Sequence, residues 1–160
     1  MKLLLMAVGN RMPPWVDAGY EEYAGRMPRE MQLKLIELKP EQRSDSSRGA
    51  RNIERVTEAE ARRIDSAIPQ SALRVALDER GAAWSTRDLA GRLAGWRMAG
   101  ADVAFMIGGA DGLHDALRRK ADFVWSLSCL TLPHGLVRVI VAEQLYRAHS
   151  ILKNHPYHRE

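Results

Sequence analysis

The side chains best suited to proton transfer or metal binding gather near the end of the chain. Four of the five histidines lie there: His134, His149, His155 and His158. A metal site is disfavoured, because His155 and His158 supply only two ligands and no cysteine or carboxylate at a suitable spacing completes them. The histidines therefore favour proton transfer or contact with a polar partner. The alternative for the last residues is a disordered polar tail.

A paired glycine follows an apolar segment in the middle of the chain. Ile107 leads into Gly108-Gly109-Ala110-Asp111-Gly112. Glycines let a ligand approach the backbone, and Gly112 permits a tight turn. The dinucleotide-binding pattern G-x-G-x-x-G is absent, since Ala110 and Leu113 stand where it needs glycine, and no Walker lysine is present. Taken alone, the pair is more often an ordinary turn after a strand.

A second unusual segment runs from Ser126 to Gly135. Its leucines alternate with small polar residues: Leu127, Leu130 and Leu132 with Ser128, Cys129 and Thr131. Leucines can lie against the faces of an aromatic base while backbone amides contact its edge. The alternative is a buried connector to the last helix. Cys129 is the single cysteine, which excludes an internal disulfide and a cysteine-rich metal cluster, and we interpret it as a loop residue.

The segments 107–112 and 126–135 can form a site only if secondary-structure elements position them. The apolar run from Met1 to Asn10 predicts a buried first strand, since it is too short to span a membrane and lacks the flanks of a signal peptide. Pro13 and Pro14 suit the start of a helix, and the residues around Leu33 to Ile36 predict a second strand. From Leu73 onward the prediction is regular: strand 73–77, helix 86–99 after the N-cap Ser85, strand 103–107, helix 113–120, strand 123–125 and helix 135–151.

This alternation predicts an α/β fold in one domain, 1–160, with a parallel sheet and helices on both faces. Ligands of such sheets bind beyond the carboxyl ends of the strands. Three of these ends stand out, at 77–81, 107–112 and 126–135. If their strands are neighbours, the three segments line one pocket.

The stretch between the second and third strands is polar. Residues 39–51 carry Arg43, Arg48 and Arg51, which are candidate phosphate contacts. A solvated linker is equally consistent with this composition. A charged helix follows to about Ile68, with Ile53, Val56 and Ile64 as its expected buried face. The net charge of +4 and pI near 9.5 permit a polyanionic partner without requiring one.

The last helix has apolar residues on more than one face. A helix of this kind needs two surfaces to pack against. One is its own sheet, and the other is expected to be the same helix of a second subunit, because twofold dimers are the commonest oligomers. The alternative is a central helix in a monomer. The residues concerned are Leu136, Val137, Val139, Ile140, Val141, Leu145, Tyr146 and Ile151.

Ordered motifs in the second half of the chain point to one known family. They are Leu77-Asp78-x-x-Gly81, Ile107-Gly108-Gly109-x-x-Gly112-Leu113, Ser126-Leu127-Ser128-x-Leu130-Thr131-Leu132-Pro133-His134, Val137-Arg138-Val139, Glu143-Gln144-Leu145-Tyr146-Arg147-Ala148 and Asn154-His155-Pro156-Tyr157-His158-Arg159-Glu160. Over essentially its whole length, including Met1 to Gly9, the chain resembles the ribosomal RNA large-subunit methyltransferase H family of the SPOUT superfamily.

The resemblance implies a fold with a C-terminal deep trefoil knot, a homodimer and S-adenosylmethionine as cofactor. The expected location is the cytoplasm, because the chain has one cysteine and no segment of membrane-spanning length. The implied reaction is methylation of N3 of a pseudouridine in 23S ribosomal RNA of the large subunit. Because an 18.0 kDa chain has little surface beyond its cofactor site, we expect the RNA to be presented by a larger particle, the assembled ribosome. The implied cofactor-binding residues are Leu77, Gly108, Gly109, Leu127, Ser128, Cys129, Leu130, Thr131, Leu132 and Pro133. Those implied to lie toward the RNA and the target base are His134, Arg138, Tyr157, His158 and Arg159.

The cofactor's sulfonium already activates the methyl group, so the protein must chiefly orient the target nitrogen and remove its proton. His134, His155 and His158 are candidates for the base, or for stabilising the anionic ring, and the sequence leaves the choice open. The main rival is a non-catalytic RNA-binding factor that kept the fold, against which the intact Gly108 and Gly109 argue. The others are a SPOUT methyltransferase acting on tRNA and, more distantly, a nicotinamide-dependent dehydrogenase.

Overall fold

A five-stranded parallel sheet, in the order β2-β1-β4-β3-β5, organises the protein. The computed structural model describes residues 1–43 and 49–158. The α/β class and the parallel sheet are confirmed. The strands are β1 (Leu3–Val8), β2 (Leu33–Leu38), β3 (Leu73–Ala83), β4 (Val103–Ile107) and β5 (Phe123–Ser126), and the helices are α1 (Pro14–Ala24), α2 (Ala50–Ala67), α3 (Thr86–Met98), α4 (Asp115–Lys120) and α5 (His134–Leu152), with a 3-10 turn at Arg29–Met31.

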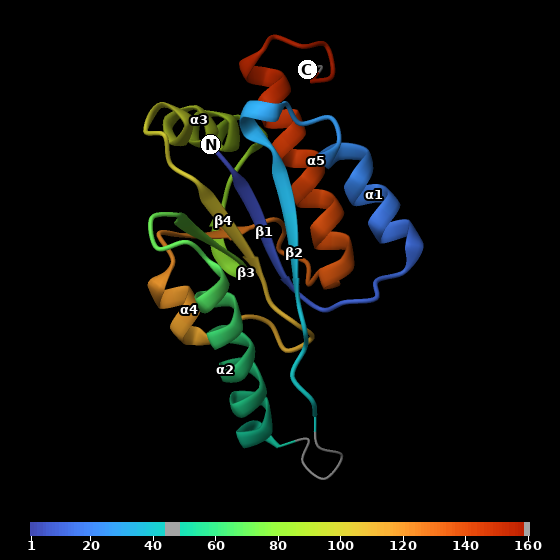
Figure 1. Ribbon diagram of the computed structural model, residues 1–160, viewed down its shortest axis with the longest axis vertical. Coiled ribbons are helices and arrows are strands. Elements are labelled where there is room, and N and C mark those ends of the chain that lie inside the picture. The colour runs from blue at the N-terminus through green and yellow to red at the C-terminus, as the bar shows by residue number, and fades with distance from the viewer. Residues whose placement is uncertain (44–48, 159–160) are drawn as a thin grey trace.

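Helices cover both faces of the sheet, as the sequence predicted (Figure 1). Successive residues of β1 point to opposite faces. Leu3 and Leu5 belong to the core beneath α1, α3 and α5, whereas Leu4 and Met6 belong to the core beneath α2 and α4. Every residue of β1 and of β4 is buried, which explains their continuous apolar sequences.

Local signals set several helix ends. Helix α1 begins at Pro14, and Ser85 caps α3 by accepting a hydrogen bond from the backbone N–H of Asp88, whose side chain bonds back to Ser85. Gly100, which follows α3, has a φ of +65° and ends the helix in the left-handed region. These boundaries confirm the predicted starts of both helices and the glycine stop.

The predicted buried face of α2 is correct for Val56 and Ile64 but wrong for Ile53, which is 43% exposed. The first turns of α2 extend beyond the end of the sheet, so Ile53 has no sheet surface to cover (Figure 1).

Of the three arginines singled out in the polar stretch, Arg48 lies outside the described residues. Among residues 1–43 and 49–158, no helix combines the length and the apolar character needed to cross a bilayer.

Candidate active site

A cavity of about 590 Å³ lies at the carboxyl edge of β3, β4 and β5. Three stretches of chain supply most of its wall: residues 77–80 from β3, 107–113 after β4 and most of 125–134 after β5. They meet because β3 lies between β4 and β5 in the sheet. The predicted convergence of three strand ends is therefore confirmed. The volume is within the range of small-molecule sites.

The β3 side differs from the prediction. Strand β3 does not end at Leu77 but runs to Ala83, and both Leu77 and Ala82 are registered opposite Trp125. The residues between them form a bulge on the cavity side. Gly81 is required there, because a Cβ would lie 2.6 Å from the backbone of Val124. The bulge brings Asp78 and Glu79 to the cavity wall.

The paired glycines line the cavity, but their missing side chains face the protein itself. A Cβ on Gly108 would lie 2.3 Å from the carbonyl carbon of Gly112, and one on Gly109 would lie 2.9 Å from Oε2 of Glu60. Gly112 has a φ of +79° and its N–H donates to the carbonyl of Gly109, 3.0 Å away. The glycines are therefore required mainly so that residues 108–112 can form a tight turn. The sequence did not show this packing role.

The segment after β5 forms the opposite wall. The hydroxyl of Ser126 donates to the carbonyl of Ser128, and Ser128 Oγ accepts from the N–H of Leu130, each at 2.9 Å. These bonds hold a loop whose leucine side chains give the cavity an apolar surface. All the sequence-predicted cofactor residues line the cavity except Cys129, which is exposed. The 72% exposure of Leu130 leaves its side chain free to cover a ligand.

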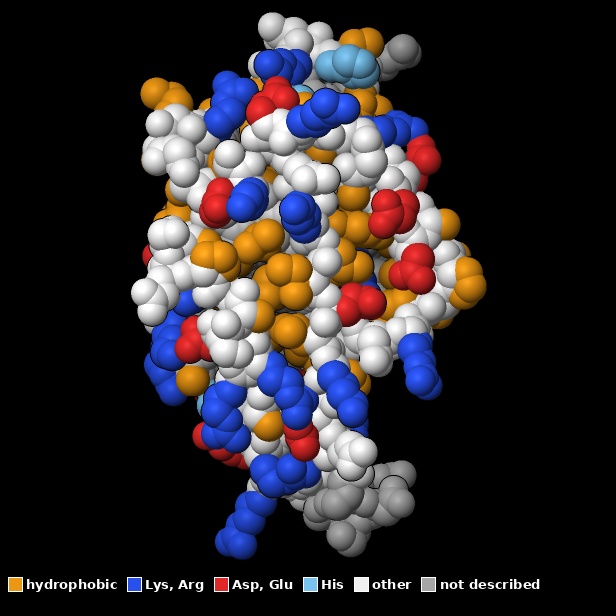
Figure 2. All heavy atoms as spheres, viewed as in Figure 1, with side chains coloured by type: hydrophobic (Ala, Val, Ile, Leu, Met, Phe, Trp, Pro, Cys, Tyr) orange, Lys and Arg blue, Asp and Glu red, His pale blue; other side chains and the backbone are white. Residues whose placement is uncertain are grey.

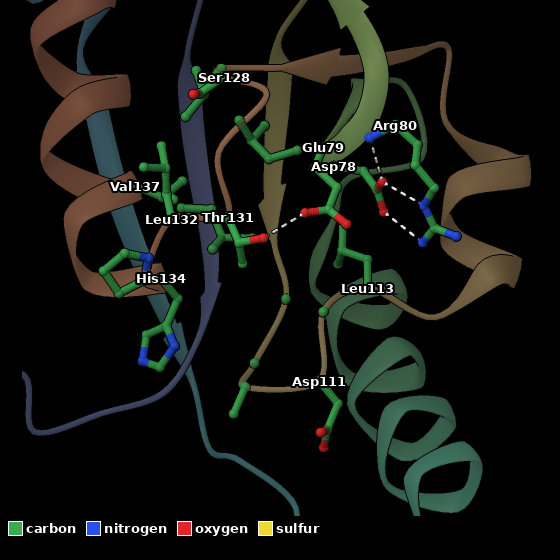
Figure 3. A pocket seen from close by; sticks show the side chains of 18 of the residues that line it. Asp78, Glu79, Arg80, Asp111, Leu113, Ser128, Thr131, Leu132, His134 and Val137 are labelled. Carbon is green, nitrogen blue, oxygen red and sulfur yellow. Dashed lines mark hydrogen bonds and ion pairs between the residues drawn. The ribbon is translucent and has the colours of Figure 1, made fainter. Parts of the chain in front are cut away.

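Charged residues that were not among the predicted cofactor-binding residues also line the cavity (Figure 3). Asp78 accepts from Arg118 Nη1 at 2.6 Å and from Arg80 Nε at 3.0 Å. Burial acts to raise the pKa of Asp78, but the hydrogen bonds from the two arginines outweigh it and hold that pKa below its usual value. Asp111 pairs with Arg43 at 2.6 Å, and Glu79 accepts from Thr131 Oγ1 at 3.0 Å. Asp78 and Gly81 were visible as a sequence motif, but the arginine partners depend on the fold.

His134 begins α5 and lines the cavity. Its Nε2 lies 3.7 Å, and Arg138 Nη2 lies 3.4 Å, from the point where a Cβ on Gly9 would stand. The three residues thus meet where β1 ends. Burial, and secondarily the charge of Arg138, lower the pKa of His134 below 6.5. The imidazole is therefore neutral at physiological pH and able to accept a proton.

The resemblance implies that Arg138 lies toward the RNA and the target base, and the structure adds that this residue is buried. Its side chain is fully buried, donating to the carbonyl of Gly9 and to Glu37 Oε1, both at 2.7 Å. A buried guanidinium held in this way cannot reach an RNA from its present position. It acts instead on the end of β1 and on His134.

The tail residues lie away from the cavity of their own protomer. Tyr157 donates to Glu143 Oε1 at 3.1 Å and packs edge-on against Tyr146, with ring centroids 4.8 Å apart. These partners follow His134 by roughly 13 to 18 Å along the helix axis. Both ring nitrogens of His158 are buried and have no hydrogen-bond partner among residues 1–43 and 49–158, and Arg159 lies outside these described residues. The structure therefore does not bring the tail and His134 together within one protomer.

Within the described part of the chain, no group of three or more metal-binding side chains occurs. The cavity instead combines leucine walls, backbone donors from the loop after β5 and a few fixed charges. This donor set suits an organic ligand with an aromatic ring and polar edges.

Comparison with known proteins identifies relatives over the whole chain. Residues 1–158 match the family described as "Predicted SPOUT methyltransferase". The chain is 55% identical to the ribosomal RNA large subunit methyltransferase H of Burkholderia multivorans and 54% identical to that of Burkholderia cenocepacia, covering 99% of each chain in both cases.

Solved structures with much lower sequence identity share the fold. A probable methylase family protein from Haemophilus influenzae Rd KW20 matches with a TM-score of 0.55 at 14% identity, covering 99% of this chain and 70% of that one. A putative methylase family protein from Neisseria gonorrhoeae gives the same TM-score and identity, with 99% and 85% covered.

Proposed function

Because the chain belongs to the SPOUT methyltransferase family and groups with the proteins named ribosomal RNA large subunit methyltransferase H, we propose that it methylates N3 of a pseudouridine in large-subunit ribosomal RNA. The methyl donor in this proposal is S-adenosylmethionine. The observation that carries the proposal is the 55% identity over 99% of both chains, together with a cavity formed by the family motifs.

The cavity residues fit this cofactor. Leu77, Leu127, Leu130 and Leu132 offer apolar surfaces for a purine ring, and the backbone of residues 128–133 offers donors and acceptors for its edge. Gly108 and Gly109 complete the wall after β4. When bound, the cofactor supplies a methyl group activated by a sulfonium.

The chain's own contribution is orientation and proton transfer. In our proposal His134, neutral and at the cavity wall, accepts the N3 proton of the target base, which leaves a nucleophilic nitrogen. Arg138 serves as a positioning residue, since it holds the carbonyl of Gly9 beside the imidazole and favours its neutral form.

We propose that the enzyme is a homodimer. Much of the second face of α5 is covered by α1, where Val139 lies 3.1 Å from the point that a Cβ on Gly19 would occupy. Leu136 and Ile140 nevertheless remain partly exposed and available to a partner. A second subunit would also explain the tail, because Tyr157 and His158, which lie away from their own cavity, could serve the partner's cavity together with Arg159.

Phosphate contacts are proposed for the surface near α2 and α4. Figure 2 shows Lys and Arg side chains gathered over this part of the molecule. Basic side chains neutralise phosphates and give RNA binding its salt dependence. The proposed partner is the assembled ribosome in the cytoplasm. An 18.0 kDa chain has little surface for recognising RNA, and the ribosome would present the target in a fixed structure. The exposed basic residues of the two helices include Arg51, Arg55, Arg62, Arg119 and Lys120.

A deletion strain tests the proposal in the cell. Mass spectrometry of its ribosomal and transfer RNA should show the loss of one methyl group at one large-subunit pseudouridine, restored by the intact gene. Loss of a tRNA methyl group instead would move the substrate to tRNA, and unchanged RNA would favour a non-catalytic RNA-binding factor.

A further inference from the structure

Glu79 differs from the other carboxylates that line the cavity. Asp78 is neutralised by Arg80 and Arg118, and Asp111 by Arg43. Glu79 instead accepts from the neutral hydroxyl of Thr131, and within residues 1–43 and 49–158 no salt bridge to it is present. Among the described carboxylates that line the cavity, Glu79 is therefore the one that forms no ion pair.

The nearest guanidinium does not remove this charge. Arg80, the next residue, directs Nε and Nη2 to the carboxylate of Asp78 at 3.0 and 3.3 Å. Its side chain is 67% exposed, so solvent screens its attraction for Glu79. A negative charge therefore remains at the cavity wall.

The fold fixes where this charge stands. Glu79 lies in the bulge of β3, and its bond to Thr131 joins that bulge to the loop after β5 (Figure 3). The carboxylate is thus held between two walls of the cavity. In this position it can act on the charge of a bound ligand without contacting it directly.

We propose that Glu79 is a specificity-determining residue that makes the cavity prefer the cationic methyl donor over the neutral product left after transfer. This inference rests on the proposed function. S-adenosylmethionine carries a sulfonium and a net charge of about +1, whereas S-adenosylhomocysteine is a neutral thioether that lacks only the transferred methyl group, so a charged residue can separate the two ligands.

Methyl transfer removes this attraction. The lone pair of the target nitrogen forms the new N–C bond, the electron pair of the C–S bond stays on sulfur, and the N3 proton passes to the base. The sulfur becomes neutral, and Glu79 no longer holds the spent cofactor. Exchange of product for fresh donor is thereby favoured in the forward direction.

The test is the affinity of the whole protein for three ligands, measured by isothermal titration calorimetry without RNA. In Glu79→Gln the amide oxygen can still accept from Thr131, so the change removes charge and little else. We expect S-adenosylmethionine, and sinefungin with its amine in place of the sulfonium methyl, to bind about tenfold more weakly, from the Coulomb energy of charges several ångströms apart. S-adenosylhomocysteine should bind within about twofold of its original affinity.

Glu58→Gln is the matched control, because it removes the same charge from an exposed site on α2, paired with Arg62. It should leave the ratio of the affinities unchanged. Equal weakening of all three ligands in Glu79→Gln, or no weakening of either cation, would overturn the inference while leaving the proposed function intact. Failure of the unmodified protein to bind either the donor or its product would contradict both.

Discussion

At the scale of single residues, the surroundings of His134 matter most for proton transfer. Burial and the charge of Arg138 lower its pKa below the ordinary histidine value of 6.5, so the ring is protonated only in a more acidic solution than usual. Protonation there would be doubly unfavourable, because the new charge would be poorly hydrated and close to a guanidinium. A base in this site stays available throughout the physiological range.

The pH profile of methyl transfer should reflect this environment. If neutral His134 is the base, kcat/KM falls at acid pH as the imidazole gains a proton, and the lowered pKa places the midpoint of this fall below the ordinary histidine value of 6.5. His134→Gln should lower the rate at neutral pH about 100-fold and abolish the acid limb. Single-turnover rates from pH 5 to 9 measure both effects. A variant that keeps both the wild-type rate and the acid limb would exclude His134.

Arg138 should matter for stability as well as for chemistry. Arg138→Met leaves the carbonyl of Gly9 without its buried donor and Glu37 without its cation. We expect the free energy of unfolding to fall by about 2–4 kcal/mol, less than for a fully buried pair because Glu37 is 40% exposed. Urea denaturation measures this, with Arg62→Met on the surface of α2 as the control. Equal stability of the two variants would show that the buried contacts of Arg138 contribute little.

The sequence could identify these residues but not their orientation. His134 and Arg138 stand in a recognisable motif, yet the partners of Arg138 precede it by 101 and 129 residues. Contacts over such separations depend on which strands become neighbours. For the same reason the resemblance identified the position of Arg138 but not that its side chain would be buried.

At the scale of elements, the loop after β4 shows why some glycines are obligatory. A Cβ added to Gly108 would meet the backbone of Gly112 and Leu113, whereas one added to Gly109 would meet side chains, most closely the flexible end of Glu60 and then Val8 at 3.2 Å. A backbone neighbour cannot move without opening the loop, but a carboxylate can turn away. The two positions should therefore differ in their tolerance of alanine.

Substitution of single glycines tests this difference. Gly108→Ala should abolish cofactor binding, and Gly109→Ala should weaken it less, since Glu60 can shift. Gly91→Ala, in α3 with no atoms near the added Cβ, should stabilise the protein by about 0.5–1 kcal/mol. Thermal unfolding and calorimetric titration of the three variants provide the comparison. Equal effects of alanine at 108 and 109 would refute the steric argument.

Strong periodic patterns made most elements predictable. Continuous apolar segments identified β1 and β4, and proline, serine and glycine identified helix ends. The bulge of β3 was missed, because residues 78–81 are forced out by pairing with β5 and not by any local signal. The exposure of Ile53 was missed because the periodicity of a helix does not show where the helix extends beyond the end of the sheet.

At the scale of the whole molecule, the homodimer and the trefoil knot remain predictions. A dimer would bury the partly exposed residues of α5 and could bring the tail of one subunit to the cavity of the other. Neither feature follows from periodicity, since both depend on how distant parts of the chain, or two chains, pass one another.

Charge on the open face of α5 should separate the subunits. Ile140→Glu would place a carboxylate in the proposed interface, near Glu143, and desolvating it would oppose association. We expect the mass in light scattering to fall from about twice to once the 18.0 kDa of the chain, with loss of methyl transfer. Met98→Glu, at a position 88% exposed on α3, should leave the mass unchanged. A monomeric wild-type protein, or a dimer unaffected by Ile140→Glu, would contradict the proposed interface.

The activity of the enzyme is defined by the base, and by the RNA, that receives the methyl group. The most direct measurement is transfer from radiolabelled S-adenosylmethionine to purified ribosomes, prepared with and without the pseudouridines of the large subunit, followed by mapping of the labelled nucleotide. We predict label at N3 of one pseudouridine, absent when that base is unmodified uridine. Label in both preparations, or none in either despite cofactor binding, would contradict methylation of a pseudouridine in large-subunit ribosomal RNA.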